Sequence, residues 1–422
     1  MTETRAAPPP RTAAPGAAPP PLAADYRERA EVALSGLPAH APLAGVWAAL
    51  GTAGVLRDLY VPEGSGGPAG TGPGNPAGTG SGSPADIGPG GPAGTALGAP
   101  DPRRLAWLLG AVDARGENGV TLSVLVQVAS ALPVLAAAAP PPGPVRDALE
   151  QVLGGAATVA LAATDAAAAG SDLAGLGTEV SLGPDEVVVD GGKRWITTAC
   201  AADHFLVLAR HKAGRHFTSF TWVLVPADAP GVDVEAADSG LLTGGGVGHV
   251  RFTGVRLPAA HVVGRPGRGM VSFAQHMGTE RLAGALWAVA LTGRVLSDTK
   301  MRLALREIDG RPLWQDASVR RRFADCLVQV RQLRALCDSL GERVAHHQDL
   351  AAAALLKSAA ALTAEPVLAT CAQLQGADGF RRGGVQQTRS EAAVFGIGGG
   401  VTELVLGAVA DHADKVLKEL RS

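Results

Sequence analysis

The hydrophobic periodicity of this 422-residue chain changes twice, and these changes restrict the folds that the chain can adopt. Residues 25–150 place apolar side chains three and four positions apart, which is typical of amphipathic helices. From about Ala156, short runs rich in β-branched residues lie between turn sequences, and several runs alternate apolar and polar residues. Such alternation indicates half-buried antiparallel strands. From Gly267 to Leu420 the helical period returns.

This order predicts an α+β protein, because the strands are grouped together instead of alternating with helices. We expect an N-terminal helical domain at 25–150, an antiparallel β-domain at 151–265 and a C-terminal helical bundle at 266–422. The order of elements argues against a parallel sheet built from repeated strand–helix–strand units.

Two segments have compositions that cannot build a packed core. Residues 1–24 are rich in proline and alanine, and residues 64–100 are rich in glycine, proline, serine and threonine with a loose GPAGTG repeat. Such sequences bury too little apolar surface to offset the entropy lost on ordering. We expect a disordered tail and a flexible insertion at the surface of the helical domain. A hinge between domains is the alternative for the second segment.

The composition also argues against some classes of binding partner. The formal net charge is −2, so the chain has no basic excess with which to neutralise a nucleic-acid backbone. The four cysteines match neither a zinc spacing nor a disulfide framework. No uninterrupted apolar stretch reaches the roughly 18 residues of a spanning helix, and the N-terminus lacks the apolar core of a secretion signal. We therefore expect a cytoplasmic protein without nucleic-acid or membrane partners.

One carboxylate lies where an apolar side chain is expected. In the helix after Gly267, five residues spaced by four, three, four and three share one face: Phe273, Met277, Glu280, Gly284 and Trp287. A carboxylate in an apolar stripe is costly unless it is paired or protonated, and such surroundings raise its pKa. Glu280 is therefore a candidate general base. The alternative is a structural ion pair with the adjacent arginine or with a neighbouring helix.

Several motifs resemble those of the acyl-CoA dehydrogenase family. Residues 191–210 read GGKRWITTACAADHFLVLAR, similar to the family's Gly-x-Lys-x-Trp-Ile-Thr strand and the strand after it. Residues 250–273 resemble its passage from the β-domain into the C-terminal helices. TDAAAAGSD at 164–172 resembles its Thr-Glu-Pro-x-Ala-Gly-Ser-Asp loop, one residue longer and without the proline. Residues 306–312 and 373–380 resemble Arg-x-x-Phe-Gly-x-Pro and Gln-x-x-Gly-Gly-x-Gly-Phe.

This resemblance covers nearly the whole chain beyond residue 25, and it implies the family's fold with a bound FAD. Trp195 and Thr197 match residues that lie against the flavin ring, and Thr164 and Ser171 match residues that contact the flavin or its pyrophosphate. An aromatic wall and hydroxyl groups suit a planar ring with polar edges.

A second group of residues implies more than one subunit. Arg306, Gln373 and Gly376 match parts of the family that reach the cofactor of a neighbouring subunit. The fork of an arginine pairs with two pyrophosphate oxygens, and a glycine admits a close backbone N–H. The resemblance therefore implies a homo-oligomer, and the family is usually a homotetramer.

The catalytic carboxylate departs from the family's usual pattern. Most members hold it in a Tyr-Glu-Gly-Thr-Ser-Glu segment, but the matching run at 396–403 places Gly398 or Gly399 there. A minority, similar to isovaleryl- and long-chain acyl-CoA dehydrogenases, keeps the base on the first C-terminal helix just before an arginine. Glu280, followed by Arg281, matches that position. The resemblance and the helical periodicity therefore select the same residue.

A second departure concerns the carrier of the substrate. Gly278 stands where the family usually has an aspartate, and the loop at 164–172 is altered. Both changes disfavour ordinary recognition of a CoA ester, and a substrate on an acyl carrier protein fits them.

The resemblance thus implies FAD-dependent α,β-dehydrogenation of an acyl thioester, carried by CoA or an acyl carrier protein. Glu280 takes the α-proton in this interpretation, and an electron-transferring flavoprotein receives the electrons. Two alternatives remain: a flavin-dependent monooxygenase of the same fold, and a non-catalytic subunit paired with an active partner.

Overall fold

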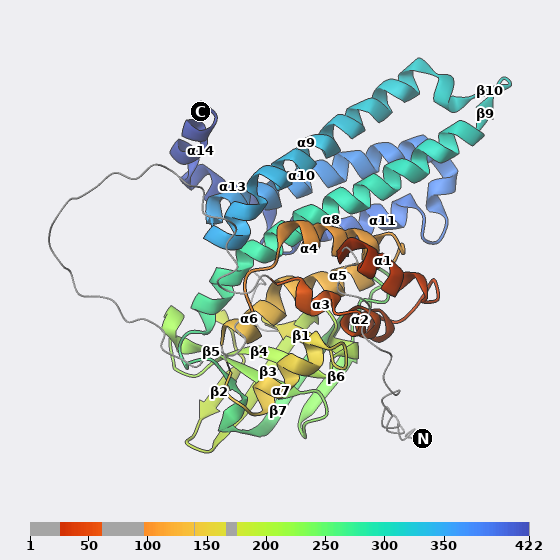
Figure 1. The fold of residues 1–422 in the computed structure, drawn as a ribbon. Coiled ribbons are helices and arrows are strands. Elements are labelled where there is room, and N and C mark those ends of the chain that lie inside the picture. Colours follow the sequence, from red (N-terminus) through yellow and green to blue (C-terminus); the bar gives the residue numbers. More distant parts are fainter. Residues whose placement is uncertain (1–25, 61–96, 139, 166–174, 422) are drawn as a thin grey trace, which may run out of the picture.

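The computed structural model describes residues 26–60, 97–138, 140–165 and 175–421 (Figure 1). The expected tail at 1–24, nearly all of the expected insertion at 64–100 and the candidate Ser171 lie outside these residues.

The described N-terminal part is helical. Its elements are α1 (Tyr26–Ser35), α2 (Leu43–Thr52), α3 (Val55–Asp58), α4 (Pro102–Asp113), α5 (Asn118–Val126), a π-helical turn (Gln127–Ala131), α6 (Leu132–Ala137) and α7 (Pro144–Leu153). Asp101 caps α4, because its Oδ1 accepts hydrogen bonds of 2.9 Å from the N–H groups of Arg103 and Arg104. Pro102 occupies the first position, where a missing N–H costs nothing.

The continuous helical run from Asn118 to Ala137 is apolar on all sides. A helix of this kind is either buried in a core or spans a membrane. By length and composition alone, two helices of the described chain could cross a membrane: Asn118–Ala137 and Leu350–Phe380, with a bent third candidate, Val385–Ile397 plus Thr402–Asp411. The sequence analysis did not predict these helices as possible spans, because it looked for uninterrupted apolar stretches. The helices contain isolated polar residues but are apolar on average. In the first helix, 89% of the apolar window is buried inside the protein.

The middle of the chain forms one sheet and confirms the predicted β-domain. Its strands are β1 (Val159–Ala162), β2 (Glu179–Leu182), β3 (Glu186–Ile196), β4 (His204–Arg210), β5 (Phe220–Pro226), β6 (Val232–Ala236), β7 (Gly248–Pro258) and β8 (Val262–Val263). The order is β6-β7-β3-β2-β4-β5-β8, with β1 beside β4. The sheet is mixed and not wholly antiparallel as predicted, because β1 and β2 both run parallel to β4. Parallel neighbours need crossover connections, which the alternation within single strands cannot reveal.

The C-terminal part is a bundle of long helices. Its elements are α8 (Gly269–Leu305), β9 (Glu307–Ile308), β10 (Arg311–Pro312), α9 (Ala317–His347), α10 (Leu350–Gln375), α11 (Val385–Ala392), α12 (Val394–Ile397), α13 (Thr402–Asp411) and α14 (Ala413–Glu419). In Figure 1, α8, α9 and α10 lie side by side, while α4 and α5 lie between them and the sheet. At 1.5 Å per residue, the 37 residues of α8 span about 55 Å.

Two buried clusters organise the packing. The larger cluster joins both helical parts to one face of the sheet through residues such as Leu206, Leu208 and Trp222. The smaller cluster fills the other face of the sheet, with Phe205, Val207 and neighbouring side chains. Successive side chains of β4 therefore point alternately into the two clusters, one on each face of the sheet. The predicted α+β architecture is confirmed.

Candidate active site

Glu280 lies on α8, and its side chain is only partly exposed. Its Oε2 accepts a hydrogen bond of 2.7 Å from Oγ of Ser130. Burial raises the pKa of Glu280 above its ordinary value, while the hydrogen bond from Ser130 and the charge of Arg281 act in the opposite direction. A carboxylate whose pKa is moved towards neutrality is suited to act as a general base.

A π-helical turn presents the Ser130 hydroxyl to Glu280. The turn covers Gln127–Ala131 and interrupts an otherwise α-helical run. Single π-turns shift the face that the following side chains present, and they are frequent at functional sites. Oε1 of Gln127, at the start of the turn, accepts a hydrogen bond of 3.0 Å from the N–H of Val159 in β1. The same turn therefore connects the Glu280 site to the β-domain.

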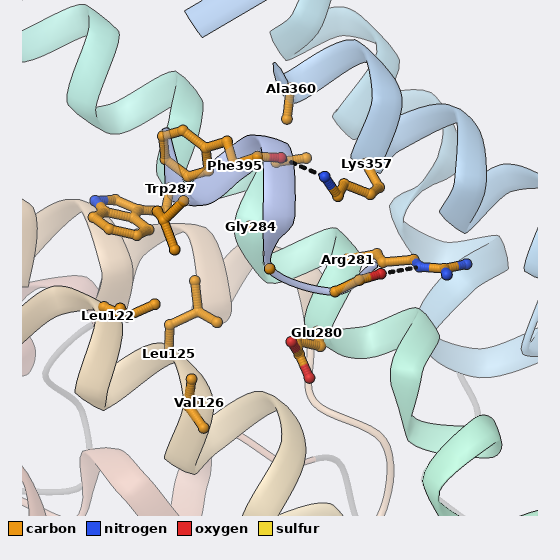
Figure 2. A pocket seen from close by; sticks show the side chains of 14 residues that line it. Leu122, Leu125, Val126, Glu280, Arg281, Gly284, Trp287, Lys357, Ala360 and Phe395 are labelled. Atoms are coloured by element: carbon orange, nitrogen blue, oxygen red, sulfur yellow. Dashed lines mark hydrogen bonds between the residues drawn. The ribbon is translucent and has the colours of Figure 1, made fainter. Parts of the chain in front are cut away.

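Ser130 contacts Oε2 of Glu280, and Gly399 lies near the other carboxylate oxygen, Oε1. The residue has φ +67°, and a Cβ built on it would lie 3.8 Å from Oε1 of Glu280 and 3.4 Å from Cγ of Arg281. Nε of Arg281 donates a hydrogen bond of 3.0 Å to the Gly399 carbonyl. Arg281 therefore holds the glycine turn, and its guanidinium points away from Glu280 in Figure 2. A side chain at residue 399 would enter the space that Glu280 now faces.

An apolar cavity adjoins Glu280. It lies between α5, α8, α10 and α12, has a volume of about 50 Å³ and is partly open to solvent. Figure 2 shows its labelled walls, with Glu280 and Arg281 on one side and Trp287 on the other. The apolar walls include Leu122, Leu125, Val126, Trp287, Ala360 and Phe395. Enclosed apolar pockets with few polar groups are the common form of small-molecule sites.

Lys357 also borders this cavity, although it is only 4% exposed. Its Nζ donates hydrogen bonds to the carbonyl of Phe395 and, at 3.1 Å, to Oγ1 of Thr402. Burial lowers the pKa of Lys357 to about 8, and the charge of Arg281 acts in the same direction. The ammonium group thus fixes the start and the end of the glycine-rich turn at 396–400.

His276 lies one helical turn before Glu280. Burial lowers its pKa to about 4, and its Nε2 has no hydrogen-bond partner within the described residues. The imidazole is therefore neutral near pH 7 and does not pair with Glu280 as a cation.

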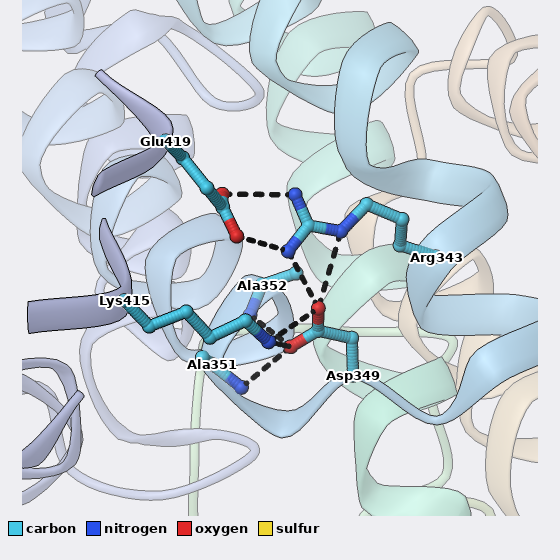
Figure 3. A network of polar contacts seen from close by, with 6 residues as sticks. All are labelled: Arg343, Asp349, Ala351, Ala352, Lys415 and Glu419. Atoms are coloured by element: carbon cyan, nitrogen blue, oxygen red, sulfur yellow. Dashed lines mark hydrogen bonds and ion pairs between the residues drawn. The ribbon is translucent and has the colours of Figure 1, made fainter. Parts of the chain in front are cut away.

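A polar network holds the C-terminal helix α14 on the corner between α9 and α10 (Figure 3). Arg343 donates to Glu419 with both terminal nitrogens, at 2.9 and 2.8 Å, and to Oδ2 of Asp349. Lys415 donates to both oxygens of Asp349 at 3.0 and 2.9 Å. Asp349 also caps α10 by accepting from the N–H groups of Ala351 and Ala352. The segment that follows the glycine-rich turn is therefore anchored.

Trp195 projects from a bulge in β3. The pairing of β3 with β7 shifts register between Lys193 and Ile196, and Trp195 has φ +56°. Its N–H donates a hydrogen bond of 3.1 Å to Nδ1 of His249, and the two rings meet edge to face at 5.2 Å. The indole remains 56% exposed. A positive φ at a bulky residue is strained, and such strain is frequent at ligand sites.

The other described candidates on the β-domain lie near this bulge. The carbonyl of Thr164 accepts a hydrogen bond of 3.2 Å from the N–H of Arg194, next to Trp195. Thr197 is half-buried just after the end of β3. The structure thus brings Thr164, Trp195 and Thr197 to one part of the β-domain.

The candidates Arg306, Gln373 and Gly376 lie at the far end of the bundle. Nη1 of Arg306 donates to the carbonyl of Gln375 at 3.4 Å, and a Cβ on Gly376 would lie 3.3 Å from that nitrogen. The side chain of Gln373 accepts a hydrogen bond from Arg322. Arg306, directly after the end of α8, follows Glu280 by 26 residues, or about 39 Å along the helix axis. Within one chain, these residues do not reach the Glu280 cavity.

Two residues of this site were missed by the sequence analysis. Lys357 is the single charge in the apolar run AAAALLKSAAAL, the same signal that singled out Glu280. Ser130 gave no signal, since a serine in a buried helix usually bonds to its own backbone.

Comparison with known protein families agrees with this architecture. Residues 160–255 match the acyl-CoA dehydrogenase middle domain, and residues 267–413 match the acyl-CoA dehydrogenase C-terminal domain. Together the two matches cover more than half of the chain. The chain belongs to the acyl-CoA dehydrogenase family. The resemblance inferred from the sequence motifs is therefore confirmed.

Individual members of the acyl-CoA dehydrogenase family are distant from this chain. Acyl-CoA dehydrogenase AFT10-1 of Alternaria alternata is 27% identical over 267 residues, which cover 60% of this chain and 61% of that protein. Acyl-[acyl-carrier-protein] dehydrogenase MbtN of Mycobacterium sp. (strain MCS) is 29% identical over 271 residues, covering 62% and 67%. The chain therefore spans about two thirds or less of the length of these curated relatives.

A solved structure shares the acyl-CoA dehydrogenase fold. A glutaryl-CoA dehydrogenase from Mycobacterium smegmatis in complex with FADH2 superposes with a TM-score of 0.68 at 19% identity. The superposition covers 74% of this chain and 80% of the other. Such a match establishes the fold and leaves the chemistry to be argued from the site.

Proposed function

We propose that the protein desaturates an acyl thioester between its α- and β-carbons, with Glu280 as the base and FAD as the hydride acceptor. The observation that carries this proposal is the meeting of Glu280 and Gly399 at an apolar cavity. Gly398 or Gly399 matches the position of the family's usual catalytic glutamate, and a side chain at residue 399 would approach the carboxylate of Glu280. Glu280, which lies on α8, thus places its carboxylate in the space that a side chain at residue 399 would occupy.

The surroundings of Glu280 support this role. Ser130 occupies Oε2 with a hydrogen bond, so Oε1, which faces Gly399, is the oxygen left to take the α-proton. The raised pKa of Glu280 brings its basicity closer to that of a weakly acidic carbon. The apolar walls, together with a substrate that fills the cavity, would limit the access of water to the carboxylate during the proton transfer.

Residues of the β-domain fit the isoalloxazine ring of FAD. A tryptophan that is more than half exposed, held by a strained bulge and by His249, offers a preformed flat surface. Large aromatic side chains are usually buried, so this surface suits a planar ligand. The solved relative in complex with FADH2 supports the choice of cofactor. When bound, FAD supplies the site that accepts hydride from the β-carbon of the substrate.

The proposed partners follow from the family and from the placement of Arg306. Arg306 lies about 39 Å along the axis of α8 from Glu280, and Gly376 lies beside it, so contacts of these residues with a cofactor of a second copy would suit the family's arrangement. We therefore propose a homo-oligomer, with an electron-transferring flavoprotein as acceptor. Relatives that act on acyl carrier protein, together with Gly278, favour a carrier-protein substrate over a CoA ester.

The position of Glu280 also favours a dehydrogenase over the two alternatives, a flavin-dependent monooxygenase and a non-catalytic subunit. Neither an oxygen-using flavin enzyme nor a non-catalytic subunit needs a base beside an apolar cavity. Glu280 is largely buried and forms no ion pair within the described residues, which costs stability, and a role as base in dehydrogenation explains why the carboxylate is there.

The decisive experiment is an anaerobic visible spectrum of the purified protein, with acyl thioesters on CoA and on carrier protein. We expect a bound flavin whose band bleaches with at least one thioester. A yellow protein that no thioester bleaches would overturn the proposal in favour of oxygen chemistry, and a colourless protein would favour the non-catalytic subunit.

Two variants separate the base from the cofactor site. Glu280→Gln should retain FAD and lose about 10²- to 10⁴-fold in turnover, whereas the exposed Glu403→Gln serves as a matched control. Trp195→Ala should weaken FAD retention, with Trp107→Ala, a half-buried tryptophan on α4, as its control. Unimpaired turnover in Glu280→Gln would contradict the assignment of the base.

A further inference from the structure

The cavity beside Glu280 ends in a corner made by two aromatic rings. Trp287 and Phe395 both line it, and their ring centroids are 4.8 Å apart at an angle of 65°. Edge-to-face contacts of this kind stabilise one relative orientation of the rings. Figure 2 shows Trp287 at the opposite side of the cavity from Glu280.

A buried ion pair fixes the Trp287 ring. Its Nε1 donates a hydrogen bond of 3.0 Å to Oδ1 of Asp113, which is 1% exposed. Arg294 holds the same carboxylate with bonds of 2.7 Å to Oδ2 and 3.1 Å to Oδ1. A two-point arginine contact is directional, so it sets the position of the carboxylate and hence of the indole.

A second buried charge fixes Phe395. The ammonium group of Lys357 donates to the Phe395 carbonyl and also to Thr402. Phe395 therefore cannot move away from Trp287 without breaking a charge-assisted hydrogen bond in the interior. The Trp287 indole and the backbone of Phe395 are therefore each held by a buried polar group, which restricts the movement of the corner.

The helix sets the depth of the cavity. Trp287 follows Glu280 by seven residues, or about 10 Å along α8. Carbon atoms in contact stay about 4 Å apart, which leaves about 6 Å between the level of Glu280 and the ring. An extended chain advances about 3.5 Å over three bonds, so this space accepts about five bonds beyond the α-carbon.

Gly284, between Glu280 and Trp287, keeps the middle of the cavity open. It lines the cavity, and a Cβ built on it meets no atom within 4 Å. Glycine within a helix is destabilising by about 0.5–1 kcal/mol relative to alanine, so a side chain here would fill the cavity without straining the helix.

We propose that the Trp287–Phe395 corner limits the substrate to short, apolar acyl chains of about six to eight carbons at most, counted from the carbonyl. This inference rests on the proposed function and adds the substrate class to it. Among the described residues, the charged side chains that line the cavity are Glu280, Arg281 and Lys357, and the two cations donate to backbone carbonyls. A hydroxylated or carboxylated chain would find no hydrogen-bond partner in the corner.

The test is a series of saturated thioesters of 4, 6, 8, 12 and 16 carbons, on the carrier that bleaches the flavin. We expect kcat/KM of the wild-type holoenzyme to fall at least about 100-fold between 6 and 12 carbons. Trp287→Ala should raise kcat/KM for 12 carbons at least about tenfold. Equal kcat/KM for 6 and 16 carbons in the wild type would overturn the inference while leaving the proposed function intact.

Gly284→Val is a second variant, at a position where a Cβ meets no atom within 4 Å. It should lower kcat/KM for 6 carbons at least about tenfold. The matched control is Gly293→Val on the same helix, where a Cβ also meets no atom within 4 Å and which does not line the Glu280 cavity. Equal losses in the two variants would refute the assigned cavity.

Calorimetric binding of the same thioesters separates the two hypotheses. If no thioester bleaches the flavin but binding still weakens sharply beyond eight carbons, the proposed function is wrong and the length limit stands. If chains of every length bind equally, the length limit is wrong.

Discussion

Replacing Ser130 by alanine should move the acid limb of the pH–activity profile to higher pH. The Ser130 hydroxyl donates a 2.7 Å hydrogen bond to Oε2 of Glu280 and lowers the pKa that burial has raised. Glu280 acts as a base only when it is ionised, so activity rises as pH passes through its pKa. Removing a donor from the ionised form raises that pKa, and the limb follows it.

The magnitude follows from the strength of the lost bond. A hydrogen bond to a charged group contributes about 1.5–3 kcal/mol, and 1.36 kcal/mol corresponds to one pKa unit. The limb should therefore move by about one to two pH units, and turnover well above the new pKa should stay close to that of the wild type.

The assay is kcat/KM measured from pH 5 to pH 9, with flavin reduction as the readout. Ser123→Ala is the matched control, because Ser123 lies on the same helical run and donates instead to the Gly245 carbonyl at 2.8 Å. A limb that stays in place in Ser130→Ala, or moves to lower pH, would refute the assignment of this limb to Glu280.

Further predictions concern stability. Because the folded protein raises the pKa of Glu280 above its ordinary value of 4.5, the contribution of Glu280 to stability falls as pH rises above about 4.5. Glu280→Gln should therefore melt higher than the wild type at pH 7, with the difference vanishing towards pH 4; a lower melting temperature at pH 7 would contradict this. Lys357→Met leaves the Phe395 carbonyl without its donor and should lower the free energy of unfolding in urea by about 1–3 kcal/mol, and an unchanged midpoint would exclude the anchoring role. Lys415→Met removes a half-exposed partner of Asp349, so it should change stability by less than about 1 kcal/mol yet speed proteolysis of α14; equal cleavage rates would show that α14 does not depend on this contact.

The sequence was informative wherever the signal was local. Alternating residues predicted the strands, and the three- and four-residue spacing predicted the long helices. Glu280 stood out because a charge in an apolar stripe is unusual whatever the stripe packs against. The same rule applied to α10 would have found Lys357.

Pairings between distant segments were beyond such reasoning. The sheet proved to be mixed, because the neighbours of β4 depend on crossover connections and not on the pattern within β4. The Asp113 carboxylate gave no hint that it would bind Trp287, 174 residues further along the chain.

By itself, the sequence determined the order of helices and strands, the family and the candidate base, because periodicity and motifs are properties of neighbouring residues. Only the tertiary structure decided what surrounds that base. Ser130 reaches Glu280 across 150 residues, through a π-helical turn that no spacing rule announces. Arg281 holds Gly399 across 118 residues. Long-range contacts of this kind arise from how whole helices pack, and packing depends on the shapes of all the side chains at once.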